Sequence, residues 1–586
     1  MRFTIALLSL ALLGACSEPN QPQPPQVNDP APAALTSLES TDGWNLGYMA
    51  AVANPYATEA AAQMLAQGGH AVDAAIAAHL VLGLVEPESS GIGGGGFMVV
   101  YEREEKQVHF LDGRETAPAG ATADMFMREN EQMGFLDAWQ SGKSIGVPGA
   151  IALYKLAHDE YGKLPWATLF EPAIQLASEG FEVTAKMAGY LPQLAQISRL
   201  DENPGSAEYF YPNGQPLQAG SLLRNPEYAH TLQRVAQEGP SAFYSGEIAE
   251  AMAEAAQAGP EAGSMTVEDI AAYNAVSRPA VCGAWRTLNI CSATPPSSGA
   301  MQIMMANLYD GMVSENATQE QQIAAFVDAQ RLAYADRDYY FGDPDRISVP
   351  VEQLLDPRYI EARANNPTAP GDTPVAGDPS AVLGNDSAAI WAADNTDEVA
   401  GTTHFSIVDN EGNAVSITMT VESPFGSGRW AAGFLLNNEM TDFDRGFDAS
   451  AAEPANMIRP SARPRSSMSP TIILDADLDL YMVTGSPGGN SIPAYTAKTV
   501  LGIVDWGMSV QEAVNFPNII ARGDTVRVEI GREPGQELSN SLTAAGYNVE
   551  EVDGENSGLH VILVTEDGLI GAADPRREGT VISGKL

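Results

Sequence analysis

Hydrophobic periodicity predicts a first half of the chain built mainly from helices. Residues 45–52 are apolar enough for an opening strand, and helical spacing follows at 56–67 and 71–84. The second helix is apolar nearly all round, so we interpret His79 on it as a core residue rather than a catalyst. Further helices are expected at 148–161, 166–178, 298–308 and 320–340, with a strand-rich insert at 273–292.

The last third of the chain has the alternation of apolar and polar residues that is typical of strands. Phe405 to Asp409 and 414–419 flank the turn Asn410–Asn413 and predict a β-hairpin. Before it, 341–400 is rich in Pro, Gly, Asp and Asn, which predicts a long, exposed connection. Helices interrupt the later strands near 493–506 and 534–545.

A glycine run, Gly93 to Gly96, leads into a strand at 98–101. Consecutive glycines predict tight backbone packing or close approach to a ligand. A phosphate loop fits poorly, because no Gly-Lys-Ser/Thr and no helix follow. The next strand, from Val108, ends in Arg114-Glu115. An arginine there can bind a carboxylate through two N–H groups, although taken alone such a residue is more often a surface charge.

The predicted hairpin carries a candidate nucleophile, because Gly401-Thr402 stands at its entrance. If the chain is cut before Thr402, the new α-amine, with a pKa near about 7.7–8.0, can take the proton from the threonine's own hydroxyl. One residue would then supply both nucleophile and base. The alternative is that a β-branched residue simply opens a strand.

Groups suited to acyl transfer follow this threonine. They are the hydroxyl of Thr420, the carboxylates of Glu439 and Asp442, the paired hydroxyls of Ser466 and Ser467, and the turn glycines Gly488 and Gly489. A hydroxyl can orient a nucleophile, and glycine N–H groups can stabilise a developing oxyanion. Each group also has a plainer interpretation, as solvated loop charges, a cap or a turn.

The amino-acid composition limits which partners and which cellular compartment are expected. The net charge of −44, from 75 acidic and 31 basic residues, argues against nucleic acid. A surface this acidic promotes solubility, and adaptation to salt or a generally acidic proteome both remain open. Neither spacing nor neighbours of the cysteines suggest a metal site. Cys282 and Cys291 flank a possible hairpin, and in an exported protein they predict either a disulfide or two independent thiols.

The N-terminus predicts export. Arg2 precedes the apolar stretch Phe3 to Leu13, and residues 1–16 end in Leu-Gly-Ala-Cys, which resembles a bacterial lipoprotein signal with Cys16 as the lipidated residue. An ordinary secretory signal with an incidental cysteine is the alternative. Residues 17–44 predict a disordered tether rich in Pro and Gln. We therefore expect a periplasmic or cell-surface protein that touches the membrane only through a lipid anchor. Ser17, rather than Asp, follows the cysteine, which resembles the sorting signal of lipoproteins of the outer membrane.

Several longer motifs follow one another along the chain. They are Gly68–Ala75, Gly91–Met98, Asp112–Glu115, Ser144–Gly149, Tyr161–Trp166, Pro295–Gly299, Arg331–Arg337, Thr402, Asn437-Asn438, Ser466-Ser467, Gly485–Gly489 and Asp574–Arg577. Together they closely resemble the γ-glutamyltransferase (γ-glutamyl transpeptidase) family over nearly the whole mature chain. The resemblance implies an α+β fold, the four-layer αββα sandwich of N-terminal nucleophile hydrolases, and no cofactor. It also implies autocleavage between Gly401 and Thr402 into a large subunit, 45–401, and a small catalytic subunit, 402–586, which form one catalytic unit.

The same resemblance implies a role for each site residue. Thr402 would be the nucleophile, its free amine the base, and Thr420 the residue that orients it. Arg114, Ser466 and Ser467 would hold the α-carboxylate of a γ-glutamyl donor such as glutathione. Glu439 and Asp442 would hold the donor's α-ammonium, and the Gly488 and Gly489 amides would form the oxyanion hole. A γ-glutamyl ester on Thr402 would then pass to water or to an amino acid or peptide amine.

Two departures from the best-known members change the expected pocket. Glu422 stands where many members carry Asn, which puts three carboxylates around one ammonium and predicts that repulsion raises the pKa of one of them. The segment 444–462 is shorter than in some relatives and lacks their tyrosine-bearing lid. We expect a more open pocket that admits larger γ-glutamyl substrates.

Two other functions remain as alternatives. A glutaryl-type acylase, such as the β-lactam acylases, resembles the same scaffold but needs no partner for an ammonium, so Glu439 and Asp442 count against it. A non-catalytic surface lipoprotein that binds amino acids would use the scaffold without chemistry. The intact Thr402, Thr420 and Gly488-Gly489 argue against that function.

Overall fold

The computed structural model describes residues 44–129, 131–259, 261–384, 391–392, 394, 396, 401–447 and 450–586. The predicted signal segment with Cys16, and the tether up to residue 43, lie outside these residues. Within the described part of the chain, no helix combines the length and the apolar character that crossing a membrane requires.

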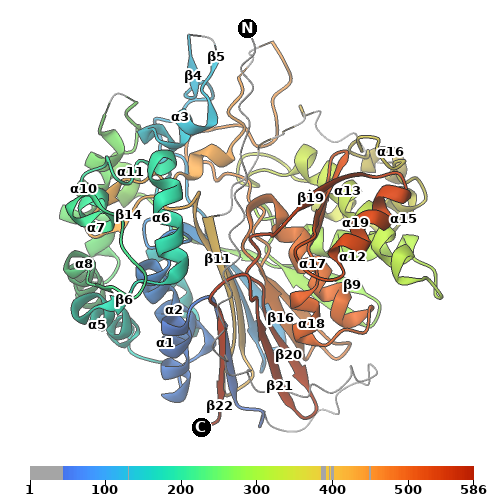
Figure 1. Ribbon diagram of the computed structural model, residues 1–586, viewed down its shortest axis with the longest axis horizontal. Helices are drawn as coiled ribbons and strands as arrows, with labels where there is room; N and C mark the ends of the chain where they lie inside the picture. The colour runs from blue at the N-terminus through green and yellow to red at the C-terminus, as the bar shows by residue number, and fades with distance from the viewer. Residues whose placement is uncertain are drawn as a thin grey trace, which may run out of the picture.

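Two antiparallel sheets stand face to face at the centre of the molecule (Figure 1). The seven-stranded sheet has the order β22-β1-β11-β12-β2-β3-β8, with β22 Thr580–Gly584, β1 Tyr48–Val52, β11 Gly401–Val408, β12 Ala414–Glu422, β2 Gly95–Glu102, β3 Gln107–Gly113 and β8 Val276–Pro279. The six-stranded sheet has the order β21-β20-β16-β15-β10-β9, with β21 Gly568–Ala573, β20 His560–Thr565, β16 Leu480–Gly485, β15 Thr471–Leu474, β10 Leu288–Ser292 and β9 Val281–Trp285. Apolar side chains such as Phe97 and Val408 from the first sheet and Ile472 and Val483 from the second fill the space between them.

Helices cover the outer face of each sheet, on opposite sides of the molecule in Figure 1. On the side of the seven-stranded sheet lie α1 Pro55–Ala66, α2 Ala71–Val85, α4 Ala150–Tyr161, α5 Glu171–Glu179, α6 Ala185–Ser198, α8 Pro226–Glu238 and α10 Glu247–Gln257, of which α1, α2 and α4 contact its strands. Against the six-stranded sheet lie α12 Ala300–Met312, α13 Gln319–Tyr340, α17 Ile492–Val504 and α18 Val510–Asn515. Each helical layer shares one apolar core with the sheet that it covers, so the predicted four-layer αββα sandwich is confirmed.

The prediction of a long exposed connection at 341–400 is wrong for its first part. Three short helices form there, α14 Val351–Leu354, α15 Pro357–Ala364 and α16 Pro379–Leu383, and Tyr359 on α15 is buried. The Asp and Pro residues that suggested a loop instead begin helices. Asp356 and Asp378 cap α15 and α16 through their side chains, and a proline follows each as the first helical residue.

Other boundaries differ by smaller amounts. The helix expected at 166–178 begins as a 3-10 turn, Trp166–Phe170, before α5, and α18 was not anticipated. The helix expected from residue 298 begins at Ala300, which leaves Ser298 outside it. The expected helix near 534–545 is α19 Gly535–Ala544, which packs beside the small sheet of β17 Ile519–Arg522, β18 Thr525–Glu529 and β19 Asn548–Val552.

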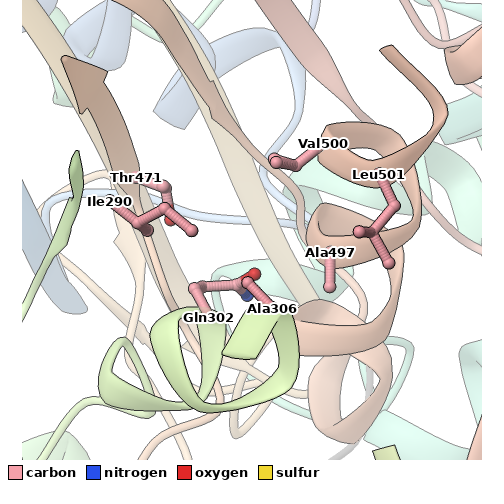
Figure 2. Close-up of a pocket in the computed structure, with 7 residues that line it drawn as sticks. All are labelled: Ile290, Gln302, Ala306, Thr471, Ala497, Val500 and Leu501. Carbon is pink, nitrogen blue, oxygen red and sulfur yellow. The ribbon is translucent and has the colours of Figure 1, made fainter. Parts of the chain in front are cut away.

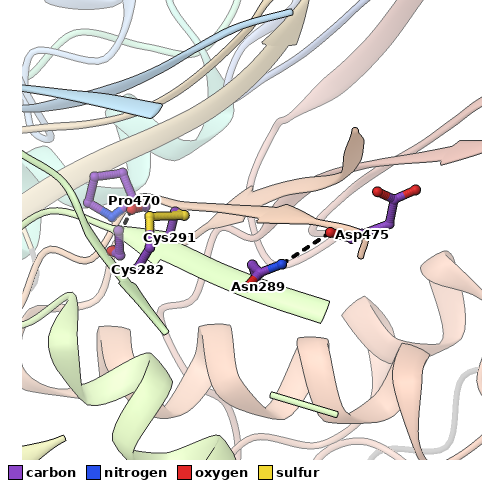
Figure 3. Close-up of a disulfide and its surroundings, with 6 residues drawn as sticks. Cys282, Asn289, Cys291, Pro470 and Asp475 are labelled. Atoms are coloured by element: carbon purple, nitrogen blue, oxygen red, sulfur yellow. Dashed lines mark hydrogen bonds between the residues drawn. A yellow bond between two sulfur atoms is a disulfide. The ribbon is translucent and has the colours of Figure 1, made fainter. Parts of the chain in front are cut away.

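The two cysteines lie directly opposite each other in the β9–β10 pair. Their Cα atoms are 4.1 Å apart and their sulfur atoms are bonded at 2.06 Å. Figure 3 shows the bond at one end of β10, while Asn289 near the other end donates to the Asp475 carbonyl at 3.1 Å. Of the two predicted alternatives, the structure has the disulfide, because the hairpin register places the cysteines directly opposite each other.

Candidate active site

The predicted hairpin of β11 and β12 sets the position of the candidate nucleophile. Thr402 pairs with Thr420, and the register shifts between Gly401 and Thr402. The Thr420 hydroxyl donates to the Gly401 carbonyl at 2.9 Å and accepts the Glu422 N–H at 2.8 Å. It also lies 3.2 Å from the Thr402 hydroxyl. Since Thr420 has one O–H and gives it to Gly401, Thr402 is the donor in the hydroxyl pair.

This arrangement has a chemical consequence at the Gly401–Thr402 bond. A hydrogen bond to the Gly401 oxygen withdraws electron density from that carbonyl and stabilises negative charge that develops there. Thr402 is 3 % exposed, so bulk water has little access to these contacts. Thr402 and Thr420 are therefore brought together as the sequence predicted, with Thr420 touching the bond that would be cut.

The glycine run packs against the strand that carries Thr420. A Cβ atom on Gly94 would lie 2.0 Å from the Thr420 carbonyl oxygen, and one on Gly96 would lie 2.3 Å from the Thr418 oxygen. A side chain at either position would push β12 away from β2. Tight backbone packing is thus the reason for these glycines.

Asn437 joins this glycine run to the turn that bears the acidic residues. Its amide nitrogen donates to the carbonyls of Gly93 and Gly146, at 2.8 and 2.9 Å. Its amide oxygen accepts the N–H groups of Gly146 and Glu439, at 2.9 and 3.0 Å. With all of these bonds made at a fully buried site, Asn437 fixes where the Glu439 turn begins.

Arg114 is the centre of the charged part of the site. Its guanidinium donates to Glu439 and, at 2.6 Å, to Asp442. It also donates to the main-chain carbonyls of Pro464 and Arg465, at 3.3 and 3.0 Å. All three charged side chains are at most 4 % exposed, so they are neither surface charges nor solvated loop residues. Arg114, predicted to bind a carboxylate, is thus paired with Glu439 and Asp442, predicted to bind an ammonium.

Glu115 adds a carboxylate that was given no role in the sequence analysis. It is fully buried, with its nearest oxygen 3.9 Å from the Arg114 guanidinium. Burial raises the pKa of Glu115 to about 7, against the attraction of Arg114. Burial also raises the pKa of Glu439 well above its usual value, and repulsion from Glu115 and Glu422 adds to the rise. A raised carboxylate pKa was predicted from repulsion among the acids, and it is found at Glu439, where burial is a larger cause than repulsion.

Glu422 lies beside these acids but has its own donors. Asn438 and Ser423 both donate to its carboxylate through their side chains. The Ser423 N–H in turn donates to the Asn438 oxygen at 2.9 Å. Glu422 has a φ of 76°, a left-handed conformation that costs free energy for a residue with a side chain. These bonds hold the strained residue at the end of β12, next to Thr420.

The paired serines lie next to the Arg465 carbonyl that Arg114 binds. Ser467 is fully buried and its hydroxyl accepts from Arg337 at 2.7 Å. Arg337 also donates to Ser298 at 3.0 Å, and Ser298 donates to the Ser466 carbonyl at 2.7 Å. The Ser466 hydroxyl accepts the N–H of Met468 at 3.2 Å. Arg337 therefore positions both serines, a role that the sequence motif containing it did not reveal.

The turn predicted as an oxyanion hole follows β16. Gly488 and Gly489 have φ values of 137° and 56°, which favour glycine. A Cβ atom on Gly488 would lie 2.4 Å from the Tyr495 ring. Arg577 donates to the Thr402 carbonyl at 2.8 Å, and both Arg577 and Pro487, the residue before Gly488, lie against Gly558. The turn thus lies near the nucleophile, and Arg577 is a contact that the sequence analysis had not assigned.

Histidines support the sheets rather than the chemistry. His79 pairs with the Tyr154 hydroxyl, and burial lowers its pKa to about 3, as expected for a core residue. His404 on β11 contacts Thr418 at 2.9 Å, and burial lowers its pKa well below the usual value. Both rings are therefore neutral at physiological pH.

A metal centre does not compete with this site in the described part of the chain. Among the described residues, no group of three or more His, Cys, Asp or Glu side chains is placed to hold a metal ion. Figure 2 shows an enclosed cavity between α12, α17 and the six-stranded sheet, lined by Gln302, Thr471 and apolar side chains. Its volume of about 10 Å³ is near the size that one water needs.

Comparisons with known proteins agree with the geometry. A profile of the family described as Gamma-glutamyltranspeptidase matches residues 57–584. The chain is 34% identical over 547 residues to the glutathione hydrolase proenzyme of Bacillus subtilis (strain 168), covering 91% of each chain. It is 33% identical over 597 residues to the glutathione hydrolase proenzyme of Escherichia coli (strain K12), covering 99% of this chain and 98% of the relative.

Among solved structures, the fold is similar to that of a cephalosporin acylase from Bacillus halodurans. The TM-score is 0.80 at 24% sequence identity, and the match covers 95% of this chain and 99% of that one. At this identity the likeness concerns the fold alone.

Proposed function

Because this chain belongs to the γ-glutamyltranspeptidase family, we propose that it matures by cutting its own Gly401–Thr402 bond and that the freed Thr402 is the catalytic nucleophile. The enzyme is a γ-glutamyltransferase and hydrolase of the N-terminal nucleophile type. The observation that carries the proposal is the Thr420 hydroxyl, which bonds the Gly401 oxygen at 2.9 Å and lies 3.2 Å from the Thr402 hydroxyl.

Maturation needs no group beyond the chain and one water. The Thr402 oxygen attacks the Gly401 carbonyl carbon, the C–N bond breaks, and the hydroxyl proton passes to the leaving nitrogen. The result is an ester between Gly401 and the Thr402 side chain. Water then hydrolyses the ester, which leaves a carboxylate on Gly401 and both a free amine and a free hydroxyl on Thr402.

Turnover repeats this chemistry on a donor. The Thr402 amine takes the hydroxyl proton as the oxygen attacks the γ-carbonyl, and the proton then passes to the departing amine. The γ-glutamyl ester that forms is released by water or by an acceptor amine. Arg577, bonded to the Thr402 carbonyl at 2.8 Å, holds the nucleophile's main chain, and the Gly488 and Gly489 amides lie in the turn beside it.

The charged pocket favours a γ-glutamyl donor. Its α-carboxylate would accept from Arg114, and its α-ammonium would lie between Glu439 and Asp442, replacing their bonds to Arg114. A glutaryl donor carries no ammonium, so it would draw Arg114 from these acids and leave them buried without a cation. The pocket therefore supports the γ-glutamyl function over the acylase alternative. The short 444–462 segment supports access for longer γ-glutamyl chains.

The proposed location follows from the N-terminus alone. Cys16 would carry the lipid, and 17–44 would tether the catalytic unit to the outer membrane. A Cys16→Ser variant that stayed in the membrane fraction would count against this anchor.

Denaturing electrophoresis of the purified protein tests the central proposal. We expect two bands, with the smaller one beginning Thr-Thr-His-Phe on N-terminal sequencing. Thr402→Ala should remain one band and lose at least about 10³-fold in γ-glutamyl transfer, because nucleophile and base vanish together. Thr402→Ser, which keeps both groups, should be cut and partly active. An intact wild-type band after prolonged incubation would instead favour the non-catalytic binding protein.

A further inference from the structure

A buried tyrosine bonds the main chain of the arginine at the centre of the charged pocket. The Tyr273 hydroxyl donates to the Arg114 carbonyl at 2.7 Å, although the two residues are 159 positions apart. Burial raises the pKa of Tyr273, so the hydroxyl keeps its proton and remains the donor. The Arg114 N–H in turn donates to the Asp112 carboxylate at 2.9 Å. Side chains therefore bind both the N–H and the carbonyl of Arg114.

A glycine makes room for the Tyr273 hydroxyl. A Cβ atom on Gly149 would lie 2.2 Å from that hydroxyl oxygen and 2.1 Å from the Gly113 carbonyl oxygen. The Gly149 N–H also donates to the Gly94 carbonyl at 2.9 Å. A side chain at position 149 would therefore displace the tyrosine, the end of β3 or both. This close approach is a physical reason for the last residue of the motif Ser144–Gly149.

The ring of Tyr273 is held by neighbours of its own. It stacks on the Tyr244 ring, with 5.9 Å between the centroids and 7° between the planes. The Tyr244 hydroxyl donates to the Pro148 carbonyl at 3.0 Å and accepts the Ala152 N–H at 3.1 Å. Since the second ring is itself bonded to the main chain, the direction in which the Tyr273 hydroxyl points is fixed.

Arg463, which follows the proposed cleavage bond in the sequence, packs against the same residues. Its guanidinium lies 6.0 Å from the centre of the Tyr273 ring, a distance at which a cation still attracts an aromatic face. It donates to the Asn274 carbonyl at 2.9 Å and lies 3.4 Å from the Asp112 carboxylate. These partners precede the cleavage bond, so Arg463 joins the small subunit to the large one beside Arg114.

The residues after Arg463 support the side chain of Arg114. Its guanidinium donates to the carbonyls of Pro464 and Arg465, at 3.3 and 3.0 Å. Tyr273 thus holds the main chain of Arg114 from the large subunit, while the segment that Arg463 anchors holds the guanidinium from the small subunit.

These supports matter because a donor would replace other bonds of Arg114. In the proposed function the donor's α-carboxylate accepts from Arg114, and Glu439 and Asp442 turn to the α-ammonium. The bonds between Arg114 and the two acids are then lost, whereas the bond from Tyr273 need not change. The tyrosine therefore holds Arg114 in place throughout this exchange of partners.

We propose that Tyr273 is a positioning residue for the donor, because its hydroxyl fixes Arg114 where the guanidinium meets the α-carboxylate. Arg463 completes this support across the two subunits. The inference rests on the proposed function, since it concerns how a γ-glutamyl donor is bound. Tyr273 acts through Arg114 and not on the reacting carbonyl, so its loss weakens binding in the ground state and the transition state alike.

Tyr273→Phe tests the proposal by removing one hydroxyl. With γ-glutamyl-4-nitroanilide as donor, we expect KM to rise about five- to tenfold and kcat to stay within about twofold, as for the loss of one hydrogen bond. Two competitive inhibitors show which group of the donor is affected. The inhibition constant of L-glutamate should rise by the same factor. That of 4-aminobutyrate, which keeps the ammonium but lacks the α-carboxylate, should not change.

Further variants separate positioning from general damage. Tyr340→Phe removes the same kind of bond elsewhere, from a buried tyrosine to the Gly377 carbonyl at 2.8 Å, and should leave KM and both inhibition constants unchanged. Arg463→Gln should repeat the effect of Tyr273→Phe, and Arg463→Lys, which keeps a positive charge beside Asp112, should recover much of the loss. If Tyr273→Phe does not fold or is not cut, the two Arg463 variants give the answer through the same measurements.

The outcomes are distinct. An unchanged KM in a cut variant, equal rises in both inhibition constants, or a fall in kcat without a rise in KM would each overturn the positioning role. Each of these results would leave the proposed function standing, because the wild type would still transfer the γ-glutamyl group. Absence of γ-glutamyl transfer by the wild-type enzyme would overturn the proposed function itself.

Discussion

The nucleophile hairpin and the charged donor pocket lie side by side, yet they are built in opposite ways. The hairpin takes Thr402 and Thr420 from two neighbouring strands and connects them through neutral hydroxyls and main-chain groups. The pocket takes Arg114 from the end of one strand and Glu439 and Asp442 from a distant turn, and connects them through buried charges.

The hairpin and the pocket are held in place by different interactions. Strand register positions the hydroxyls, and losing one of their neutral hydrogen bonds costs only about 1–2 kcal/mol. Charge balance holds the pocket, and an unpaired buried charge costs several kcal/mol. We therefore expect the pocket to be the fragile part of the site and the hairpin to be the forgiving one.

The largest effect should come from removing the cation of the pocket. Arg114→Gln leaves Glu439 and Asp442 without their shared partner, and we expect the free energy of unfolding to fall by about 3–5 kcal/mol. Chemical denaturation measures it. Arg128→Gln is the matched control, because Arg128 is 53% exposed in its pairs with Asp137 and Glu261 and should cost less than about 1 kcal/mol. Equal losses in the two variants would show that the buried pocket is no more sensitive to loss of its cation than an exposed ion pair is.

The proton held by Glu115 should appear as a pH dependence. The pKa of Glu115 rises from 4.5 to about 7 in the folded protein, so the folded state binds more protons than the unfolded state between these values. Stability from this group is complete below about pH 4.5 and is lost as pH rises through 7. Relative to Glu115→Gln, the wild type should lose roughly 3 kcal/mol over that window. Parallel stability curves for the two proteins would show that Glu115 does not hold the proton.

The smallest effect should come from the hairpin. Thr420→Val keeps the shape of the side chain but removes the hydrogen bond to the Gly401 carbonyl, and we expect cleavage to slow by about 10–30-fold, as for a barrier raised by nearly 2 kcal/mol. The rate is read from the decay of the uncut band with time. Thr420→Ser should restore most of it. Cleavage at the wild-type rate in Thr420→Val would mean that this hydroxyl does not assist the cut.

Much of the fold was predictable because its signals are local. Alternation and turn residues predicted β11 and β12, and helical spacing predicted α1 and α2 within a residue or two. The prediction of a loop at 341–400 was wrong because its local signals are ambiguous. Its Asp-Pro pairs suit both a loop and a helix start, and only the burial of Tyr359 against the second core shows which one forms.

For the site, the sequence predicted which residues take part but not the contacts between them. The motifs indicated Thr402, Thr420, Arg114, Glu439 and Asp442 as candidate site residues, and in the structure they lie in one site. No pattern indicated that Arg114 bonds both acids directly, or that Arg577 contacts the Thr402 carbonyl. Those contacts join positions more than 150 residues apart.

The sequence by itself determined which reactive groups are present, the strand register that pairs Thr402 with Thr420, and the family to which the chain belongs. Only the tertiary structure decided how the charges pair, which carboxylate keeps a proton, and that Tyr273 bonds the main chain of Arg114. The physical reason is that register follows from neighbouring residues, whereas the strength of a charge depends on burial, and burial is decided by segments packed together from across the whole chain.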